Sequence, residues 1–145
     1  MKTSVRFCDV TVGMQLDELT QHVSQEYIDR YAVASLDLNP IHIDPDWSTR
    51  AQTFGRPQTV LHGMATMSLM ASVITRAWGS TAQITRMKSK FTKPVWVGQT
   101  LSLKGAVSEL HYLNPGRNFV VVNVQATDSD SELVGFCDFD VRLPG

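Results

Sequence analysis

The amino-acid sequence predicts an α+β fold in which a curved antiparallel β-sheet wraps around one long central helix. Residues 64–78 are small or apolar on nearly every side, which is typical of a helix that other elements enclose. Beyond Gly79, segments that alternate in polarity or are rich in β-branched residues follow one another, separated by short turns. Consecutive strands of this kind form an antiparallel sheet, and wrapping it around the helix buries the apolar side of both.

Each element of this fold has its own signal in the sequence. Ser24 is a good N-cap for a helix over residues 25–35, and Asp44 followed by Pro45 opens a second, shorter helix that ends before Phe54. The apolar residues that recur at helical spacing in the first helix, and that we expect to be buried, are Ile28, Tyr31, Ala32 and Leu36. The predicted strands cover residues 17–23, 84–91, 101–110, 119–126 and 132–143.

Length, charge and cysteine content exclude several classes of protein. The 145 residues are predicted to form one domain (1–145), and a net charge of −1 gives no electrostatic reason to bind nucleic acid or an anionic membrane. Cys8 and Cys137 are too few for a disulfide framework or a metal cluster and are interpreted as reduced thiols. The first residues lack the apolar run of a signal peptide, and residues 60–78 are too polar for a membrane span. We therefore expect a cytoplasmic protein with neither nucleic acid nor membrane as partner.

The most informative stretch is residues 35–42, which brings Asp37, Asn39 and His42 close together in the chain. Pro40 fixes its own φ and favours an extended residue before it, so the preceding helix is expected to end here in a stiff turn. A carboxylate and an imidazole on such a turn can divide acid and base roles near neutral pH. The same pattern also fits a helix-stop turn with a buried imidazole, and residues 35–42 alone do not separate the two interpretations.

A second informative stretch is His62-Gly63, where the central helix is expected to begin. The first N–H groups of a helix have no acceptor within it, and together with the helix dipole they favour an anion at this end. Gly63 has no side chain and allows a ligand to approach the main chain closely. A tight turn into a helix explains the same glycine equally well.

The motifs and their order along the chain resemble those of one enzyme family. Residues 35–42 match Ser-Gly-Asp-x-Asn-Pro-x-His, except that Leu36 stands in place of glycine. The likeness continues in Ile43-Asp44-Pro45, in Phe54-Gly55-Arg56-Pro57 before His62-Gly63-Met64, and in Phe91 to Gly98, where Gln99 follows in place of aspartate. Over nearly its whole length the chain is thus similar to the MaoC-like, R-specific enoyl-CoA hydratases (hydratase 2 type), which have the hotdog fold.

The resemblance implies reversible hydration of a trans-2-enoyl-CoA to an (R)-3-hydroxyacyl-CoA, a reaction of fatty acid metabolism. Carried over by position, Asp37 and His42 are the catalytic pair, and Asn39 steadies their geometry. The N–H of Gly63 then stabilises negative charge on the thioester oxygen. We favour Asp37 as the base and His42 as the proton donor. His62 either lines the acyl or thioester site or only packs.

Expected cofactors and partners are few. The resemblance implies no cofactor besides the CoA thioester that serves as substrate. It also suggests a homodimer or a dimer of dimers, with the acyl tunnel near the interface. No metal is expected, because the histidines lie far apart in the sequence and form no His-x-x-x-His pair. These residues are His22, His42, His62 and His111.

Several alternatives stay open. A thioesterase with the same fold, a non-catalytic acyl-CoA-binding subunit and a dehydratase of acyl-carrier-protein substrates are the rivals of the hydratase. The basic side chains on one face of residues 84–91 either contact the phosphates of CoA or form a solvated face; they are Arg86, Lys88 and Lys90. Leu36 is expected to be strained if its position requires a positive φ.

Overall fold

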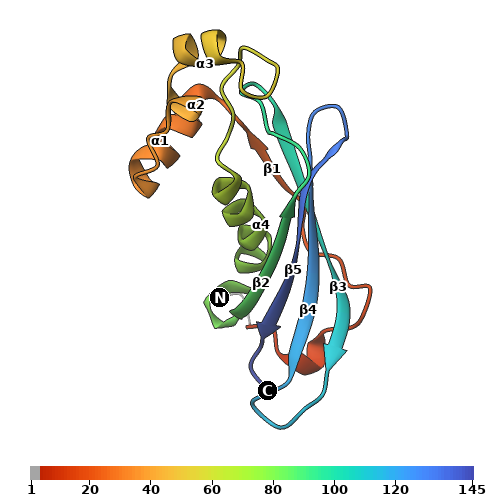
Figure 1. Cartoon of the computed structure of the whole chain (residues 1–145). Coiled ribbons are helices and arrows are strands. Elements are labelled where there is room, and N and C mark those ends of the chain that lie inside the picture. Colours follow the sequence, from red (N-terminus) through yellow and green to blue (C-terminus); the bar gives the residue numbers. More distant parts are fainter. Residues whose placement is uncertain (1–3) are drawn as a thin grey trace.

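A five-stranded sheet with a long helix against one face forms the body of the protein (Figure 1). The computed structural model describes residues 4–145. All neighbouring strands are antiparallel, in the order β1-β3-β4-β5-β2. The long helix is α4 (Gly63–Trp78), and the strands are β1 (Leu19–His22), β2 (Gln83–Phe91), β3 (Thr100–His111), β4 (Phe119–Thr127) and β5 (Leu133–Arg142). This arrangement confirms the predicted α+β fold.

Alternate residues of the strands and one side of α4 make the core. Val122 of β4 and Phe139 of β5 are fully buried, and so is Met70 of α4. Gly105 of β3 allows α4 to come close to the sheet, because a Cβ at this position would lie 3.1 Å from the Val73 side chain. The core is therefore formed by side chains of the strands and of α4, and the two come close together at Gly105.

The other side of α4 is open to solvent, although its sequence is apolar nearly all round. Met64 is 56% exposed, and the hydroxyls of Ser68 and Ser72 donate to main-chain carbonyls four residues earlier in the helix. The expectation that α4 is enclosed on every side is therefore wrong for a single copy of the chain. None of the helices within residues 4–145 combines the length and the apolar character that crossing a bilayer requires.

Strand β2 lies at the edge of the sheet and is more exposed than its alternating sequence predicted. Met87 and Phe91 face the same side as the core residues of β5, yet they are 38% and 46% exposed. An edge strand has a neighbour on one side only, so its inward side chains are covered less completely. The prediction of a half-buried strand is thus wrong for most of β2.

Three short helices lie together at one end of the molecule, beyond one end of α4 (Figure 1). The hydroxyl of Ser24 accepts a hydrogen bond from the N–H of Tyr27, and Asp44 caps the third helix in the same way. Both caps were predicted from the sequence. The helices are α1 (Gln25–Ser35), α2 (Pro40–Ile43) and α3 (Pro45–Ala51); two 3₁₀ turns are η1 (Phe7–Asp9) and η2 (Gly79–Thr81).

Helix α2 was not predicted. Pro40 ends the preceding helix but also opens the next one, because its fixed φ suits the first helical position. The Oδ1 atom of Asn39 caps α2 by accepting from the N–H of Ile41 at 3.2 Å. His42 therefore lies on a helical turn whose direction is set by Asn39 and Pro40, and not in the stiff turn that we expected at the end of the preceding helix.

Leu36 ends α1 in the left-handed conformation, with φ 61° and ψ 20°. The strain expected for a leucine in place of glycine is therefore present. The predicted burial of this residue is wrong, because it is 83% exposed. Ile28 and Ala32, which precede it on the same stripe of α1, are fully buried as predicted.

Replacing Leu36 by glycine is expected to stabilise the protein. The left-handed conformation costs a non-glycine residue about 1–3 kcal/mol, and the greater freedom of glycine in the unfolded chain offsets part of that gain. For Leu36→Gly we expect the free energy of unfolding in urea to rise by about 1 kcal/mol. Leu36→Ala removes the exposed side chain but keeps the strain, so it should leave the stability unchanged. Equal stability of the two variants would contradict strain at this position.

A buried carboxylate joins the end of β2 to the turn between β4 and β5. Asp128, which is 6% exposed, accepts from Lys93 Nζ at 3.0 Å and from the N–H groups of Asp130 and Glu132. Lys93 also pairs with the Glu132 carboxylate. Burial alone would raise the pKa of Asp128, but these hydrogen bonds outweigh it and lower the pKa below its ordinary value.

Asp128→Ala is expected to lower the free energy of unfolding at pH 7 by about 2 kcal/mol, because buried donors lose their acceptor. A carboxyl whose pKa is lowered in the folded state stabilises the protein above its unfolded-state pKa of about 3.9. That contribution is lost as the pH falls through the lower, folded-state value. Denaturation of the wild type and of Asp128→Ala should therefore show a difference in stability that shrinks in acid. A difference that does not depend on pH would contradict a role for the charge of Asp128.

Candidate active site

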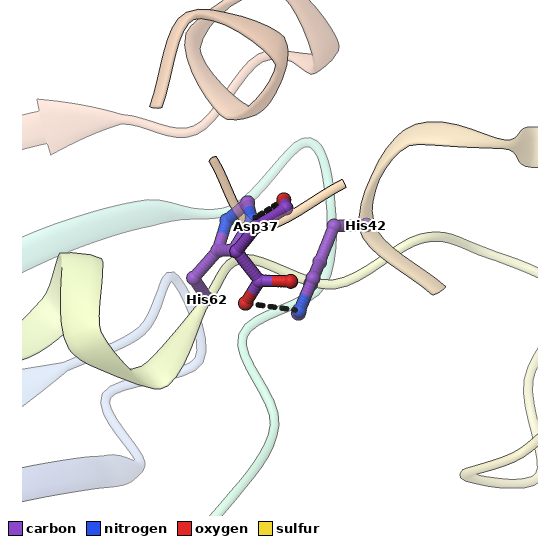
Figure 2. Close-up of side chains that lie close together, drawn as sticks. All are labelled: Asp37, His42 and His62. Carbon is purple, nitrogen blue, oxygen red and sulfur yellow. Dashed lines mark hydrogen bonds and ion pairs between the residues drawn. The ribbon is translucent and has the colours of Figure 1, made fainter. Parts of the chain in front are cut away.

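The turn between α1 and α2 presents the carboxylate of Asp37. The main-chain N–H of Asp37 donates to Ser35 Oγ, and its Oδ1 atom accepts from the N–H of Asn39, both at 3.3 Å. Oδ1 is thereby occupied, and Oδ2 lies 3.8 Å from His42 Nε2 (Figure 2). This separation is too long for a direct hydrogen bond and short enough for one water molecule to contact both atoms. The structure thus brings the predicted pair together, with Asn39 supporting Asp37.

The ring of His42 is held in one tautomer. Its Nδ1 lies 2.8 Å from the carbonyl oxygen of Val60, and since a carbonyl only accepts, Nδ1 carries the hydrogen. Burial lowers the pKa of His42 most strongly, and nearby His62 lowers it further, whereas the Val60 hydrogen bond and Asp37 raise it; the net shift is downward. At neutral pH the imidazole is therefore uncharged, and its Nε2 offers a lone pair toward Asp37.

Gln25 supports the main chain at His42 and was not identified from the sequence. Its Nε2 donates to the His42 carbonyl at 2.8 Å, and its Oε1 accepts from the buried hydroxyl of Thr59 at 2.6 Å. Gln25 thus ties the first turn of α1 to the segment that precedes α4. No local pattern marks such a residue, because its role depends on two partners that are distant in the sequence.

His62 lies beside Asp37 and His42 and does not line the neighbouring cavity. It is 2% exposed, and its ring stacks on that of His42 with the ring centres 3.7 Å apart and the planes inclined by 24° (Figure 2). Its Nε2–H donates to the main-chain oxygen of Asp37 at 3.0 Å. Of the two interpretations that the sequence left open, packing describes the position of this ring and contact with a bound acyl group does not.

Asp37, His42 and His62 form a cluster that the sequence did not foresee, with one potential ligand atom from each within 4.8 Å of the others. An ion bound by two imidazoles must lie in the plane of each ring, about 2 Å from its nitrogen. Stacked rings inclined by only 24° cannot meet this condition for one ion. The cluster therefore suits proton transfer better than metal binding, and the absence of a metal stays a prediction.

A cavity of about 490 Å³ opens beside the pair, between α2 and the start of α4. Apolar side chains make up most of its wall, and His42 and Gly63 both line it. Gly63 is the first residue of α4, so its N–H has no acceptor within the helix. The ring of Phe91 packs beside it, since a Cβ on Gly63 would lie 3.5 Å from that ring. The cavity thus reaches His42 and a free helix N-terminus, whereas Asp37 lies beside His42 and does not line the cavity.

The basic residues of β2 lie on the other face of the sheet. In the strand register, Arg86 lies opposite Asp140 of β5 and Lys88 lies opposite Asp138. Arg86, Lys88 and Lys90 alternate along β2 with the residues that face inward. None of the three lines the cavity within the described chain. Contact between these side chains and the phosphates of CoA stays a prediction that one copy of the chain does not explain.

Two other basic side chains lie at or near the cavity. Lys93 lines it, although Asp128 and Glu132 already neutralise its charge. The guanidinium of Arg56 lies 5.2 Å from the centre of the Trp96 ring. Trp96 in turn contacts Phe54, which lines the cavity.

Comparison with known proteins identifies relatives over most of the chain. The MaoC-like domain matches residues 9–129. The chain is 36% identical over 94 residues to 3-hydroxyacyl-thioester dehydratase Y of Mycobacterium tuberculosis, covering 63% of this chain and 30% of that protein. It is 30% identical over 122 residues to the (R)-specific enoyl-CoA hydratase of Rhodospirillum rubrum, covering 83% of this chain and 80% of that enzyme. The chain thus spans less than a third of the first relative and most of the second.

Solved structures support the same relationship at the level of the fold. The unliganded R-hydratase PhaJ1 from Pseudomonas aeruginosa matches 97% of this chain and 86% of its own, with a TM-score of 0.82 at 22% identity. At this identity the likeness shows the fold alone, and it confirms the hotdog architecture. Together with the match over residues 9–129 and the relative from R. rubrum, it shows that the chain belongs to the MaoC-like domain family.

Proposed function

We propose that the protein hydrates trans-2-enoyl-CoA thioesters reversibly to (R)-3-hydroxyacyl-CoA. The observation that carries this proposal is the 3.8 Å separation of Asp37 Oδ2 and His42 Nε2, next to a mostly apolar cavity that also reaches the N-terminus of α4. One water between the two atoms is placed to attack an alkene in the cavity. The names of the relatives from M. tuberculosis and R. rubrum support acyl thioesters as the substrate class.

The protonation state of His42 suggests how the proton moves. In the resting site neither Nε2 of His42 nor the Asp37 carboxylate carries a hydrogen toward the water, so neither begins as an acid. His42 Nε2 takes a proton from water as the oxygen bonds to the β-carbon. The imidazolium, stabilised by Asp37, then gives this proton to the α-carbon. His42 thus remains the proton donor expected from the resemblance, but it first acts as the base, and Asp37 orients the water.

Gly63 supplies the electrostatic part of the reaction. Attack at the β-carbon pushes an electron pair through the α-carbon onto the thioester oxygen, which becomes enolate-like until the α-carbon is protonated. A free N–H at a helix N-terminus is suited to that charge, and one such donor contributes about 3 kcal/mol to the lowering of a barrier. Gly63 is therefore the proposed oxyanion donor.

The pH dependence separates the two assignments of His42. If the neutral ring is the base, kcat/KM is lost as the pH falls through the pKa of His42, which lies below its ordinary value of about 6.5. If His42 had to begin protonated, kcat/KM would instead fall as the pH rises through that pKa. The acidic limb should coincide with the titration of the His42 ring, followed by NMR.

Crotonyl-CoA tests the function directly. Purified protein should remove the absorbance of the enoyl thioester and form (R)-3-hydroxybutyryl-CoA without releasing a thiol. Free thiol would identify a thioesterase instead. Binding of the substrate without turnover, also with longer or carrier-bound acyl groups, would identify a non-catalytic subunit.

Association with a second copy is part of the proposal. The open side of α4 and the exposed edge strand β2 leave apolar side chains such as Met64 and Phe91 uncovered in one chain. A homodimer would cover such surfaces. Light scattering of the purified protein should give twice the mass of one chain, or four times that mass for a dimer of dimers, and a monomer would contradict this part of the proposal.

A further inference from the structure

The buried ring of His62 contacts both members of the catalytic pair, although the proposed reaction makes no use of it. The ring stacks on His42, and its Nε2–H donates to the main-chain oxygen of Asp37 (Figure 2). It does not line the cavity, so a substrate there does not reach it. Any effect of His62 on the reaction must therefore pass through the residues that it contacts or directly precedes.

The contacts of His62 fix the tautomer of its ring. Because the carbonyl of Asp37 only accepts, Nε2 carries the hydrogen, and Nδ1 is buried without a hydrogen-bond partner in the described part of the chain. The ring of Tyr31 from α1 lies 4.7 Å away, and the ring of His42 from α2 lies 3.7 Å away. His62 therefore meets Asp37 as a hydrogen-bond donor through Nε2.

The turn that carries Asp37 needs such an anchor. Its side chain is 52% exposed, it follows the strained Leu36, and its hydrogen bonds to Ser35 and Asn39 are local. The bond from His62 differs, because it ties this turn to the first turn of α4. His62 also directly precedes the proposed oxyanion donor, so one residue links all three groups of the proposed site.

We propose that His62 is a positioning residue: its ring holds the main chain of Asp37 and supports one face of His42. In this way Asp37 Oδ2 and His42 Nε2 keep the separation that one water molecule requires. The inference rests on the proposed hydration by these two residues. It predicts that the N–H donor and the aromatic surface of His62 contribute separately.

Two variants separate these contributions. His62→Phe keeps a flat ring against His42 and loses the donor, whereas His62→Gln keeps an N–H donor of similar reach and loses the ring. For His62→Phe we expect kcat to fall by about 10²-fold, because a shift of the Asp37 turn misplaces the attacking water, while KM for crotonyl-CoA changes less than about threefold. His62→Gln should retain more of the activity. Loss of a neighbour that opposes charge on His42 should raise the pKa of His42 in both variants.

The His42 titration is read by NMR and needs no turnover, so it tests His62 separately from the proposed function. Unchanged kcat in His62→Phe together with an unchanged His42 titration would overturn the inference. A parallel loss of kcat and Tm in both variants with an unchanged titration would also overturn it, since His62 would then only fill space. If His62→Phe does not fold, the titration and kcat of His62→Gln decide. Failure of the wild type to hydrate any enoyl thioester would refute the proposed function. A raised His42 pKa in the variants would still establish that His62 acts on His42.

Discussion

Asp37→Asn and His42→Asn should each reduce kcat for the hydration of crotonyl-CoA by about 10³-fold, within the range of general acid–base catalysis. Asp37→Asn retains an oxygen that can accept from the N–H of Asn39, but it removes the charge that stabilises an imidazolium. His42→Asn places an amide N–H near the position of Nδ1, where it can donate to Val60, and deletes Nε2. Each change therefore removes one functional atom and leaves the local hydrogen bonds in place.

Asp46→Asn is the matched control for the charge, because this exposed carboxylate lies in the neighbouring helix α3 and does not line the cavity. It should keep the wild-type kcat. If Asp37 and His42 act on one water, the double variant should be scarcely slower than either single variant, since residues that act as a unit are not additive. Independent, multiplying losses would argue against a shared water.

Gly63→Pro should lower kcat by about 10²–10³-fold while the fold is retained, because it deletes the proposed oxyanion donor. Proline is well tolerated at the first position of a helix, where the N–H has no helical acceptor. The preceding residue also suits it: His62 has φ −58° and ψ 133°, in the extended region that a following proline prefers. Gly63 is therefore a position at which the donor can be removed with little disturbance of α4.

Gly63→Ala is the control that separates the N–H from the absence of a side chain. Its Cβ would lie at ordinary contact distance from the ring of Phe91 and would leave the N–H in place. We expect it to change KM more than kcat, because it narrows the cavity. A similar loss of kcat in both variants, measured at saturating crotonyl-CoA, would show that space and not the donor limits the reaction.

Local signals in the sequence predicted those features of the structure that depend on a few neighbouring residues. Helix α1 begins and ends as predicted, because Ser24 caps it and the Asp-x-Asn-Pro turn stops it. The strain at Leu36 was also predicted, because leucine stands where the family motif has glycine. Helix α2 was missed since Pro40 was considered only as a stop signal, although the same fixed φ also starts a helix.

Features that depend on contacts between distant segments were not predictable in this way. The stack of His62 on His42 and the link from Gln25 to Thr59 exist only because α1, α2 and the start of α4 meet. Exposure of Leu36 depends on where the left-handed turn directs the chain, which helical spacing does not encode. The proposed acid and base roles rest on the tautomer of His42, and this tautomer depends on the carbonyl of Val60.

Heat should inactivate the protein before it unfolds the sheet. The proposed catalytic pair lies on the turn and short helix between α1 and α3, whereas most of the large buried apolar side chains belong to α4 and the strands. Segments with fewer buried apolar contacts open at a lower free energy than the whole domain. Amide hydrogens of α2 and α3 should therefore exchange with solvent faster than those of β4 and β5. Hydration of crotonyl-CoA should be lost, reversibly, at temperatures where the circular dichroism of the sheet is still that of the folded protein.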